Sequence, residues 1–222
     1  MVSRIAVFET VRLEPDGVRL LSSHLARAAR AGAGLEAEAR AALARLLPSA
    51  PLVVRLDFTA DGLVVGQRPV PSRSATRLAL TGGYDPADVR RERKAVDRGW
   101  ADGPLARARA AGADDALLTA PDGLLGETTL ANVVVELADG TLVTPPASGL
   151  LSGVTRAFAI RELDVVERVL GVADLATARA VVLANAVRGL WPVDRVDAWV
   201  IDSAATASRL HARWLELPLE AP

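Results

Sequence analysis

The spacing of hydrophobic residues changes several times in the first part of the chain. Alternating apolar and polar positions around an EPDG turn predict a β-hairpin over residues 5–21. Apolar positions three and four apart then predict a helix capped by Ser22 or Ser23, and a second helix over residues 35–47. Two more alternating segments predict another hairpin over residues 52–67. This order of elements is typical of a small α+β domain.

Glycine and proline mark a break in the middle of the chain. The segment GGYDP at residues 82–86 cannot sustain a regular helix or strand, which makes it the best candidate for a linker. We therefore expect an N-terminal α+β domain over residues 1–81, a linker over residues 82–90 and a second domain over residues 91–222.

The second domain is expected to be a mixed α/β domain. Helical spacing covers residues 98–111 and 154–170, and the tail from residue 211 has helical character. Short apolar runs bounded by turns predict strands at residues 115–119, 133–137, 141–143, 181–184 and 193–196.

Composition excludes several classes of function. The chain has 222 residues, half of them hydrophobic, and a net charge of −1, so the basic surface of a nucleic-acid binder is not expected. It contains no cysteine, which excludes disulfides and thiolate metal sites. It also lacks the long apolar run of a membrane span or a signal peptide. We expect a cytoplasmic protein that binds neither nucleic acid nor membrane.

Lysine usage draws attention to one position. Lys94 is the only lysine among 26 basic residues, and all the others are arginine. Arginine can replace lysine on a solvated surface, but a guanidinium cannot lose its proton and attack a carbonyl as a desolvated amine can. A genome rich in G and C explains the arginines and leaves the remaining lysine to be explained by chance or by chemistry.

Three clusters of polar residues could carry chemistry. They lie at residues 93–98, around Lys94, at residues 126–132, and at residues 148–156, where a Gly/Ser loop opens a helix. The N–H groups at a helix N-terminus can bind phosphate, and Gly153, Val154 and Thr155 would supply them here. An ordinary N-cap by Ser152 is the alternative.

Taken together, these clusters resemble the fold-type IV enzymes that use pyridoxal 5'-phosphate (PLP), a family that includes class IV aminotransferases and 4-amino-4-deoxychorismate lyase. The matching motifs, in chain order, are FET at residues 8–10, HLAR at 24–27, KAVDR at 94–98, ETTLAN at 127–132, TPP at 144–146 and LSGVTR at 151–156. Each motif is weak alone, but their order and spacing are specific. The resemblance implies a two-domain α+β fold like that of D-amino-acid aminotransferase, with a small N-terminal α+β domain and a larger C-terminal α/β domain.

The resemblance also implies a role for individual residues. Lys94 is expected to bind PLP as a Schiff base and later to move protons, and Glu127 to pair with the pyridine nitrogen of the cofactor. Arg27 is expected to bind the cofactor phosphate. The residues expected to complete the cofactor site are Gly153, Val154, Thr155, Asn185 and Ala186. Arg55 is expected either to bind a substrate carboxylate or to form a structural ion pair.

Two reactions remain open within this family. Thr10 matches a threonine of the lyase, which forms 4-aminobenzoate and pyruvate from 4-amino-4-deoxychorismate for folate synthesis. We assign Thr10 a catalytic role. The alternative is an aminotransferase for D-amino or branched-chain amino acids, and a homologue that binds a ligand without turnover is a third hypothesis. The family implies a small amino substrate and a homodimer.

The sequence departs from the family pattern at two places that bear on the substrate. Only seven residues precede Phe8, where family members carry a longer segment, so we expect a more open site or one completed by a partner subunit. Gly99 stands where aminotransferases have a tyrosine near the phenolic oxygen of the cofactor.

Overall fold

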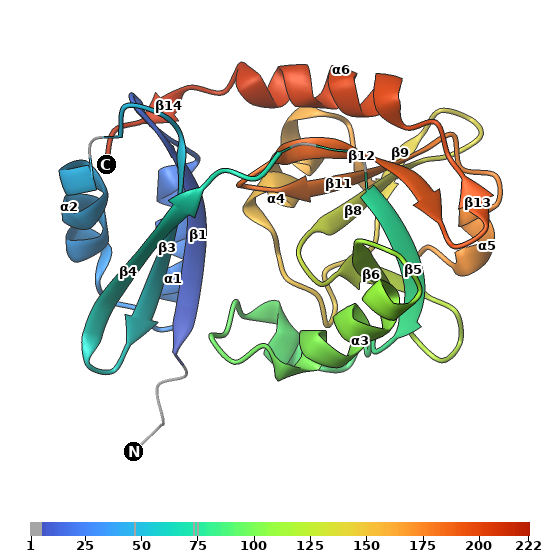
Figure 1. Ribbon diagram of the computed structural model, residues 1–222, viewed down its shortest axis with the longest axis horizontal. Helices are drawn as coiled ribbons and strands as arrows, with labels where there is room; N and C mark the ends of the chain where they lie inside the picture. The colour runs from blue at the N-terminus through green and yellow to red at the C-terminus, as the bar shows by residue number, and fades with distance from the viewer. Residues whose placement is uncertain (1–5, 47, 73, 75) are drawn as a thin grey trace. The chain divides into compact units, whose positions relative to one another are not determined.

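The computed structural model describes residues 6–222 except 47, 73 and 75, and these residues form two compact units (Figure 1). The first unit contains the chain up to Ser72 together with the segments Arg93–Asp97 and Leu217–Pro222. The second unit contains Arg73–Glu92 and Arg98–Glu216. Each unit has its own sheet and its own hydrophobic core.

The first unit is a five-stranded sheet with two helices. Its strands lie in the order β14-β2-β1-β3-β4. Their bounds are Val7–Glu14 (β1), Gly17–Arg19 (β2), Leu52–Thr59 (β3), Gly62–Pro69 (β4) and Leu219–Glu220 (β14). The helices are Leu21–Arg30 (α1) and Glu36–Leu46 (α2).

The two faces of β1 have different neighbours because side chains alternate along a strand. Val7 and Val11 belong to the buried core that also contains Leu25 of α1. Glu9 lies between them in the sequence and therefore shares their face. Phe8 and Thr10 lie on the opposite face.

The second unit is built on a nine-stranded sheet in the order β10-β9-β8-β11-β12-β5-β6-β7, with β13 paired to β12. The strand bounds are Thr76–Gly82 (β5), Asp115–Thr119 (β6), Leu125–Thr128 (β7), Asn132–Glu136 (β8), Leu142–Thr144 (β9), Val166–Glu167 (β10), Ala180–Asn185 (β11), Gly189–Val196 (β12) and Trp199–Val200 (β13). The helical elements are Val89–Glu92 (η1), Gly99–Ala110 (α3), Val154–Glu162 (α4), Val172–Leu175 (α5) and Ala204–Leu215 (α6).

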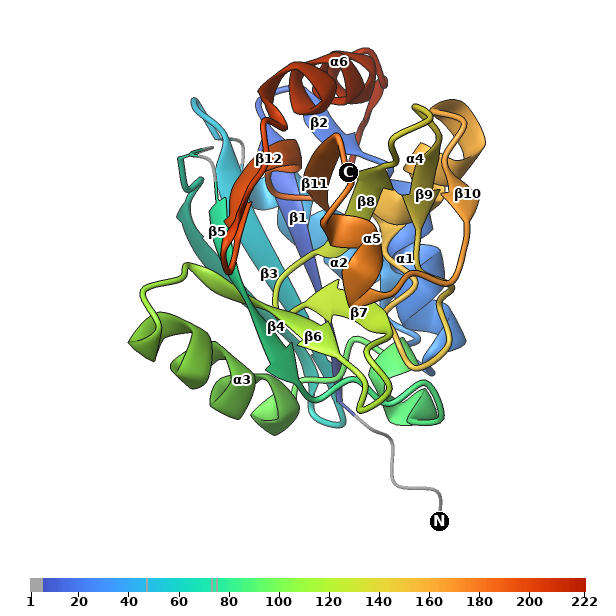
Figure 2. The same ribbon diagram turned by 90° about the vertical axis from the view of Figure 1, so that its right-hand side faces the viewer.

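Apolar strands at the centre of this sheet form its core. β8 and β11 consist mostly of buried valine, leucine and alanine, the composition expected where both faces of a sheet are covered. Figure 2 shows β12, β11, β8 and β9 side by side. α6 packs on β12 and β11, α4 packs on β11, and α3 packs on β5 and β6.

The division into units differs from the expected one at both boundaries. Residues 82–90 are part of the second unit and not a linker, since they continue directly from β5, which pairs with β6 and β12. The expected second domain, residues 91–222, loses Arg93–Asp97 and Leu217–Pro222 to the first unit. Both segments make backbone hydrogen bonds to the strands of the first sheet, which a reading of the chain from end to end cannot anticipate.

Helix bounds also differ from the expected ones. The helix expected over residues 154–170 ends at Glu162, because Asp164 adopts a positive φ of 55° and the chain then enters β10. α1 begins before the expected caps: Leu20 is its N-cap residue, and Ser22 and Ser23 lie in the first turn.

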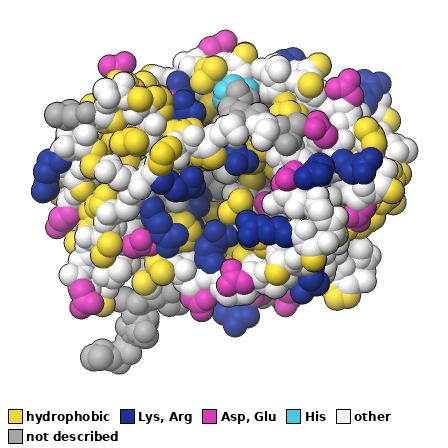
Figure 3. Space-filling view, viewed as in Figure 1, with side chains coloured by type: hydrophobic (Ala, Val, Ile, Leu, Met, Phe, Trp, Pro, Cys, Tyr) yellow, Lys and Arg dark blue, Asp and Glu magenta, His cyan; other side chains and the backbone are white. Residues whose placement is uncertain are grey.

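The surface carries both signs of charge, as the sequence predicts. Figure 3 shows basic, acidic and hydrophobic side chains on the same face. In the part of the chain that the structure describes, no helix has the length and apolar character needed to cross a membrane.

Candidate active site

Lys94 lies at the open edge of β1. The Phe8 N–H donates to the carbonyl oxygen of Lys94 at 2.8 Å, and the Val96 N–H donates to Ala6 at 2.9 Å, so that the segment extends the first sheet. The Nζ atom of Lys94 lies 5.0 Å from the centroid of the Phe8 ring, and the side chain is half-buried. The backbone of this residue is therefore fixed by sheet pairing, and its amine lies against an aromatic ring.

Glu9, Arg27 and His24 form a buried cluster in the same unit. Arg27 donates to Glu9 twice, from Nε to Oε1 at 2.8 Å and from Nη2 to Oε2 at 2.6 Å. His24 Nδ1 lies 2.8 Å from Glu9 Oε2. Glu9 and His24 are each 1% exposed. Arg27, the residue expected to bind phosphate, is thus held in place by a bidentate ion pair.

The charges of this cluster follow from its contacts. Burial raises the pKa of Glu9, but the charge of Arg27 and the hydrogen bond from His24 outweigh burial and hold that pKa well below its usual range. Burial lowers the pKa of His24, so its ring is neutral. An ionised carboxylate only accepts hydrogen bonds, so Nδ1 of His24 carries the proton. The Nε2 atom is left buried with no hydrogen-bond partner among the described residues.

The neutral, buried His24 predicts a loss of stability in mild acid. The pKa of His24 in the folded protein lies below the usual value of 6.5. At pH values between these two pKa values, the unfolded chain binds the proton more strongly than the folded protein does. The free energy of unfolding is expected to fall as the pH decreases below 6.5, by up to about 1.4 kcal/mol per pH unit. Urea denaturation between neutral pH and pH 5 measures this slope. The variant His24→Asn should show a shallower slope, and equal slopes for the two proteins would contradict the assignment.

Thr10 and Arg55 face each other across β1 and β3. Thr10 is half-buried. The Nε and Nη2 atoms of Arg55 donate to Asp57 at 2.7–2.9 Å, and its guanidinium carbon lies 3.8 Å from the centroid of the Phe8 ring. The structure therefore contains the ion pair that was one of the two expectations for Arg55.

Glu127 lies on β7 in the second unit and accepts hydrogen bonds from Asn132 and Leu151. The side-chain amide of Asn132 donates to Oε2 at 2.9 Å, and the Leu151 N–H donates to Oε1 at 3.1 Å. The same amide also donates to the Leu151 carbonyl oxygen at 3.0 Å. Glu127 is 5% exposed, so this turn carboxylate is buried and oriented rather than solvated.

The N-terminus of α4 lies next to this carboxylate in the same network. Gly153 is the N-cap residue and has no side chain to cap the helix, so glycine takes the N-cap position considered for Ser152. A Cβ atom at Gly153 would collide with Asn132 Oδ1, which explains the need for glycine. The hydroxyl of Thr155 is buried and has no hydrogen-bond partner among the residues that the structure describes. The N–H groups of a helix N-terminus beside a buried hydroxyl that lacks a described partner fit a phosphate.

This geometry predicts a selective effect of Thr155→Val. Removing an unpartnered buried hydroxyl leaves no donor or acceptor unsatisfied, so the unfolding midpoint of the cofactor-free protein should stay the same or rise. Affinity for PLP is expected to fall about 10- to 150-fold, because one hydrogen bond to a charged group contributes about 1.5–3 kcal/mol. Titration of the cofactor-free protein with PLP measures the effect. A variant that binds PLP as tightly as the wild type would exclude this hydroxyl from the phosphate site.

Asn185 ends β11, and its side chain is used locally. Its Oδ1 accepts hydrogen bonds from the N–H groups of Val187 and Arg188, and its Nδ2 donates to Leu130 at 3.3 Å. Asn185 therefore shapes the turn that contains Ala186 and ties it to the loop after Glu127.

The predicted residues thus form two groups, one in each unit. The first unit holds Lys94, Arg27, Thr10 and Arg55, and the second unit holds Glu127, Gly153, Val154, Thr155, Asn185 and Ala186. Sequence reasoning did not assign Glu9 or Asn132, although both lie in the quoted motifs. The signal for Glu9 was an acid at a buried position of an alternating strand.

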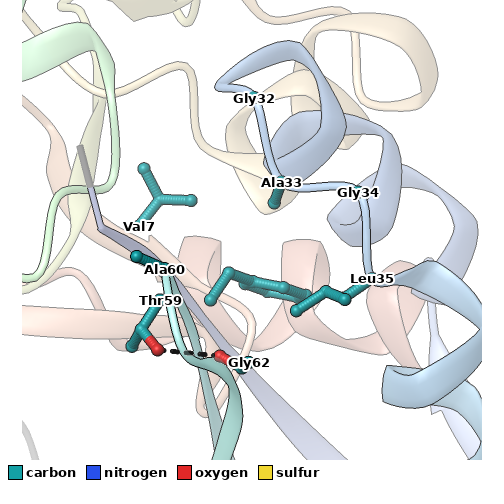
Figure 4. Close-up of a pocket in the computed structure, with 9 residues that line it drawn as sticks. Val7, Gly32, Ala33, Gly34, Leu35, Thr59, Ala60 and Gly62 are labelled. Carbon is teal, nitrogen blue, oxygen red and sulfur yellow. Dashed lines mark hydrogen bonds between the residues drawn. The ribbon is translucent and has the colours of Figure 1, made fainter. Parts of the chain in front are cut away.

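A surface hollow in the first unit is distinct from both groups. It has a volume of about 150 Å³ and lies between the segment joining α1 to α2 and the turn after β3 (Figure 4). The nine residues that line it are apolar, glycine or threonine, and Thr59 Oγ1 donates to the Gly62 carbonyl oxygen at 2.9 Å. None of them is titratable, so this hollow offers no acid–base chemistry.

Family membership follows from the sequence as a whole. The sequence model of the family described as "Amino-transferase class IV" matches residues 6–196. The chain therefore belongs to the class IV aminotransferase family, whose members are PLP-dependent enzymes, and the expected fold type and cofactor are confirmed. A search of curated proteins found no match.

Several solved structures share this fold. A fold IV transaminase from Curtobacterium pusillum, CpuTA1, is 24% identical with a TM-score of 0.81 over 97% of this chain and 87% of its own. A putative 4-amino-4-deoxychorismate lyase from Legionella pneumophila is 22% identical with a TM-score of 0.80 over 95% and 90% of the two chains. A Brucella abortus aminotransferase bound to PLP is 22% identical with a TM-score of 0.81 over 95% and 88%. At these identities the likeness establishes the fold.

Proposed function

We propose that this chain is a cytoplasmic, PLP-dependent lyase that converts 4-amino-4-deoxychorismate into 4-aminobenzoate and pyruvate. The observation that carries the choice of reaction is Thr10, a half-buried hydroxyl on β1 at a position where branched-chain aminotransferases have glycine. The putative lyase from Legionella among the similar structures supports this choice.

Each candidate residue has a role in holding the cofactor. PLP, when bound, supplies an electron sink for the bonds at the carbon that carries the substrate amine. Lys94 would hold the cofactor through Nζ, and Glu127 would accept a hydrogen bond from its ring nitrogen. Arg27 and the N-terminus of α4, with Gly153, Val154 and Thr155, bind the phosphate. Asn185 and Ala186, in the turn after β11, would complete the cofactor site.

The reaction then depends on proton transfer by the chain's own groups. The Nζ atom of Lys94 would take the proton from the ring carbon that bears the substrate amine. The carbon–oxygen bond to the enolpyruvyl group breaks, the ring becomes aromatic, and the leaving group gains a proton to become pyruvate. The Thr10 hydroxyl is placed in this scheme as the hydrogen-bond donor to the leaving oxygen. Arg55 contributes positive charge for a substrate carboxylate while it stays paired with Asp57.

The decisive experiment supplies 4-amino-4-deoxychorismate to the PLP-loaded protein and measures 4-aminobenzoate. The loaded protein should absorb at about 410–430 nm, and borohydride should remove that band. Thr10→Val and Thr10→Gly should retain the band and slow the formation of 4-aminobenzoate. A colourless protein that gains no band with added PLP would contradict the cofactor assignment.

An aminotransferase is the second candidate, and the transaminase CpuTA1 among the similar structures favours it. Amino donors such as D-alanine and leucine, tested with 2-oxoglutarate, distinguish the two reactions. Rapid transfer of the amino group without 4-aminobenzoate would overturn the lyase. A protein that binds PLP and turns over neither substrate class would be a ligand-binding homologue.

We also propose that the protein is a homodimer, as the family resemblance implies. Light scattering coupled to size-exclusion chromatography measures this directly, and a mass of one chain at micromolar concentration would contradict it.

A further inference from the structure

Several arginines of this protein bind a carboxylate through the same edge of the guanidinium. The Nε and Nη2 atoms lie side by side and match the two oxygens of an oxyanion. This edge is occupied in the pairs Arg27–Glu9, Arg55–Asp57 and Arg90–Asp88.

Arg91 presents the same edge without a partner. Its residue is 5% exposed, and neither Nε nor Nη2 has a hydrogen-bond partner among the described residues. The Nη1 atom donates to the Gly83 carbonyl oxygen at 2.5 Å, and the guanidinium carbon lies 4.2 Å from the centroid of the Trp100 ring. The side chain is therefore fixed in place. Two donor nitrogens without a partner on a buried cation are costly, and a ligand oxyanion would accept a hydrogen bond from each.

The surroundings of Arg91 belong to the Glu127 site. Burial lowers the pKa of Arg91, and the charge of Glu127 is the largest effect that opposes burial, followed by Asp88, Tyr84 and Asp85. Tyr84 packs against the residue before Glu127, since a Cβ atom at Gly126 would lie 2.9 Å from the Tyr84 ring. All of these residues lie in the second unit.

We propose that Arg91 binds an oxyanion of a ligand that Glu127 holds. The proposal rests on the assignment of PLP to Glu127. The oxyanion has two sources, namely the phenolic oxygen on the cofactor ring and a carboxylate of the amino substrate. The phenolic oxygen is carried by the same ring as the nitrogen assigned to Glu127, and Gly99, beside Trp100, has no side chain that could donate to it.

Arg91→Met tests the proposal, with Arg90→Met as the matched control. Methionine has a similar length and can pack on Trp100, but it carries no donor. Arg90 is the neighbouring arginine, its side chain is 86% exposed, and it is paired with Asp88.

If the phenolic oxygen is the ligand, Arg91→Met should weaken PLP binding about tenfold or more. The pH midpoint of the visible band should also rise by about one unit, because removing a cation favours the more positively charged form. Arg90→Met should leave the affinity and the midpoint unchanged.

The second source gives a different pattern. If Arg91 binds a substrate carboxylate, PLP affinity and the band stay at wild-type values and KM for the amino substrate rises about tenfold. Arg91→Lys keeps the charge and loses the paired N–H groups, so its effect should be intermediate in either case. The proposal would be overturned if Arg91→Met kept the wild-type PLP affinity, the wild-type pH midpoint of the visible band and the wild-type KM. A wild-type protein that shows no visible band with PLP would instead overturn the proposed function itself.

Discussion

Replacing Lys94 by alanine is expected to abolish the visible band of the PLP-loaded protein and to lower turnover by about 10²- to 10⁴-fold. The loss has two physical causes, since the variant has neither an amine to bind the cofactor carbonyl nor a base to take the substrate proton. Absorption spectra and single-turnover rates with 4-amino-4-deoxychorismate measure the two effects separately.

Lys94→Arg is the matched control for charge. Its guanidinium keeps a cation near the Phe8 ring but cannot deprotonate, so it should lose as much turnover as alanine. The backbone carbonyl of residue 94 still accepts the Phe8 hydrogen bond in both variants, so the unfolding midpoints should stay close to that of the wild type. Turnover at wild-type rate in either variant would remove Lys94 from the proposed mechanism.

Glu9→Gln is expected to destabilise the folded protein by about 3–5 kcal/mol. The substitution removes the negative charge that compensates the buried guanidinium of Arg27, whose Nε and Nη2 atoms both donate to Glu9. Such a loss is a large share of the total stability of a typical domain, about 5–15 kcal/mol. Urea denaturation at neutral pH measures this loss. The shift of the urea midpoint gives the difference in the free energy of unfolding when the dependence on urea concentration is the same for both proteins.

A double variant separates the fold from the cofactor site. Glu9→Leu combined with Arg27→Met replaces the ion pair by apolar side chains and should recover part of the stability lost in the single variant, because the Nδ1–H of His24 is then left without its acceptor. The same protein lacks the guanidinium assigned to the phosphate, so it should fold and still bind PLP weakly. A loss of less than 1 kcal/mol in Glu9→Gln, or tight PLP binding by the double variant, would contradict these roles.

Local sequence patterns predicted most of the elements but missed those that depend on distant partners. β6 has the expected bounds, Asp115–Thr119, because its apolar run is bounded by turns. β7 was not expected, since LGET has no alternation and its Glu and Thr are buried by contacts made elsewhere in the second unit. The helix predicted over residues 154–170 is longer than the observed one, because helical spacing gives no sign of the positive φ at Asp164.

The sequence predicts only part of the candidate site, because local patterns do not show contacts between distant segments. Lys94 was identified from composition and motif, but its pairing with β1 depends on a contact between distant segments. Arg90 and Arg91 are identical in type and adjacent in sequence, yet one side chain is exposed and the other residue is buried. Only the folded structure distinguishes Arg90, which is paired with Asp88, from Arg91, whose Nε and Nη2 atoms have no hydrogen-bond partner among the described residues.

The pairing of β14 with β2 has a consequence for how this protein is made. β14 is the edge strand of the first sheet, and Glu220 accepts hydrogen bonds from both the backbone N–H and the hydroxyl of Ser22 at the start of α1. A ribosome delivers Ser22 198 residues before Glu220, so the first unit remains incomplete until this later segment has been synthesised. Contacts of such wide sequence separation slow folding, and the exposed edge of β2 is open to wrong partners until the native one arrives.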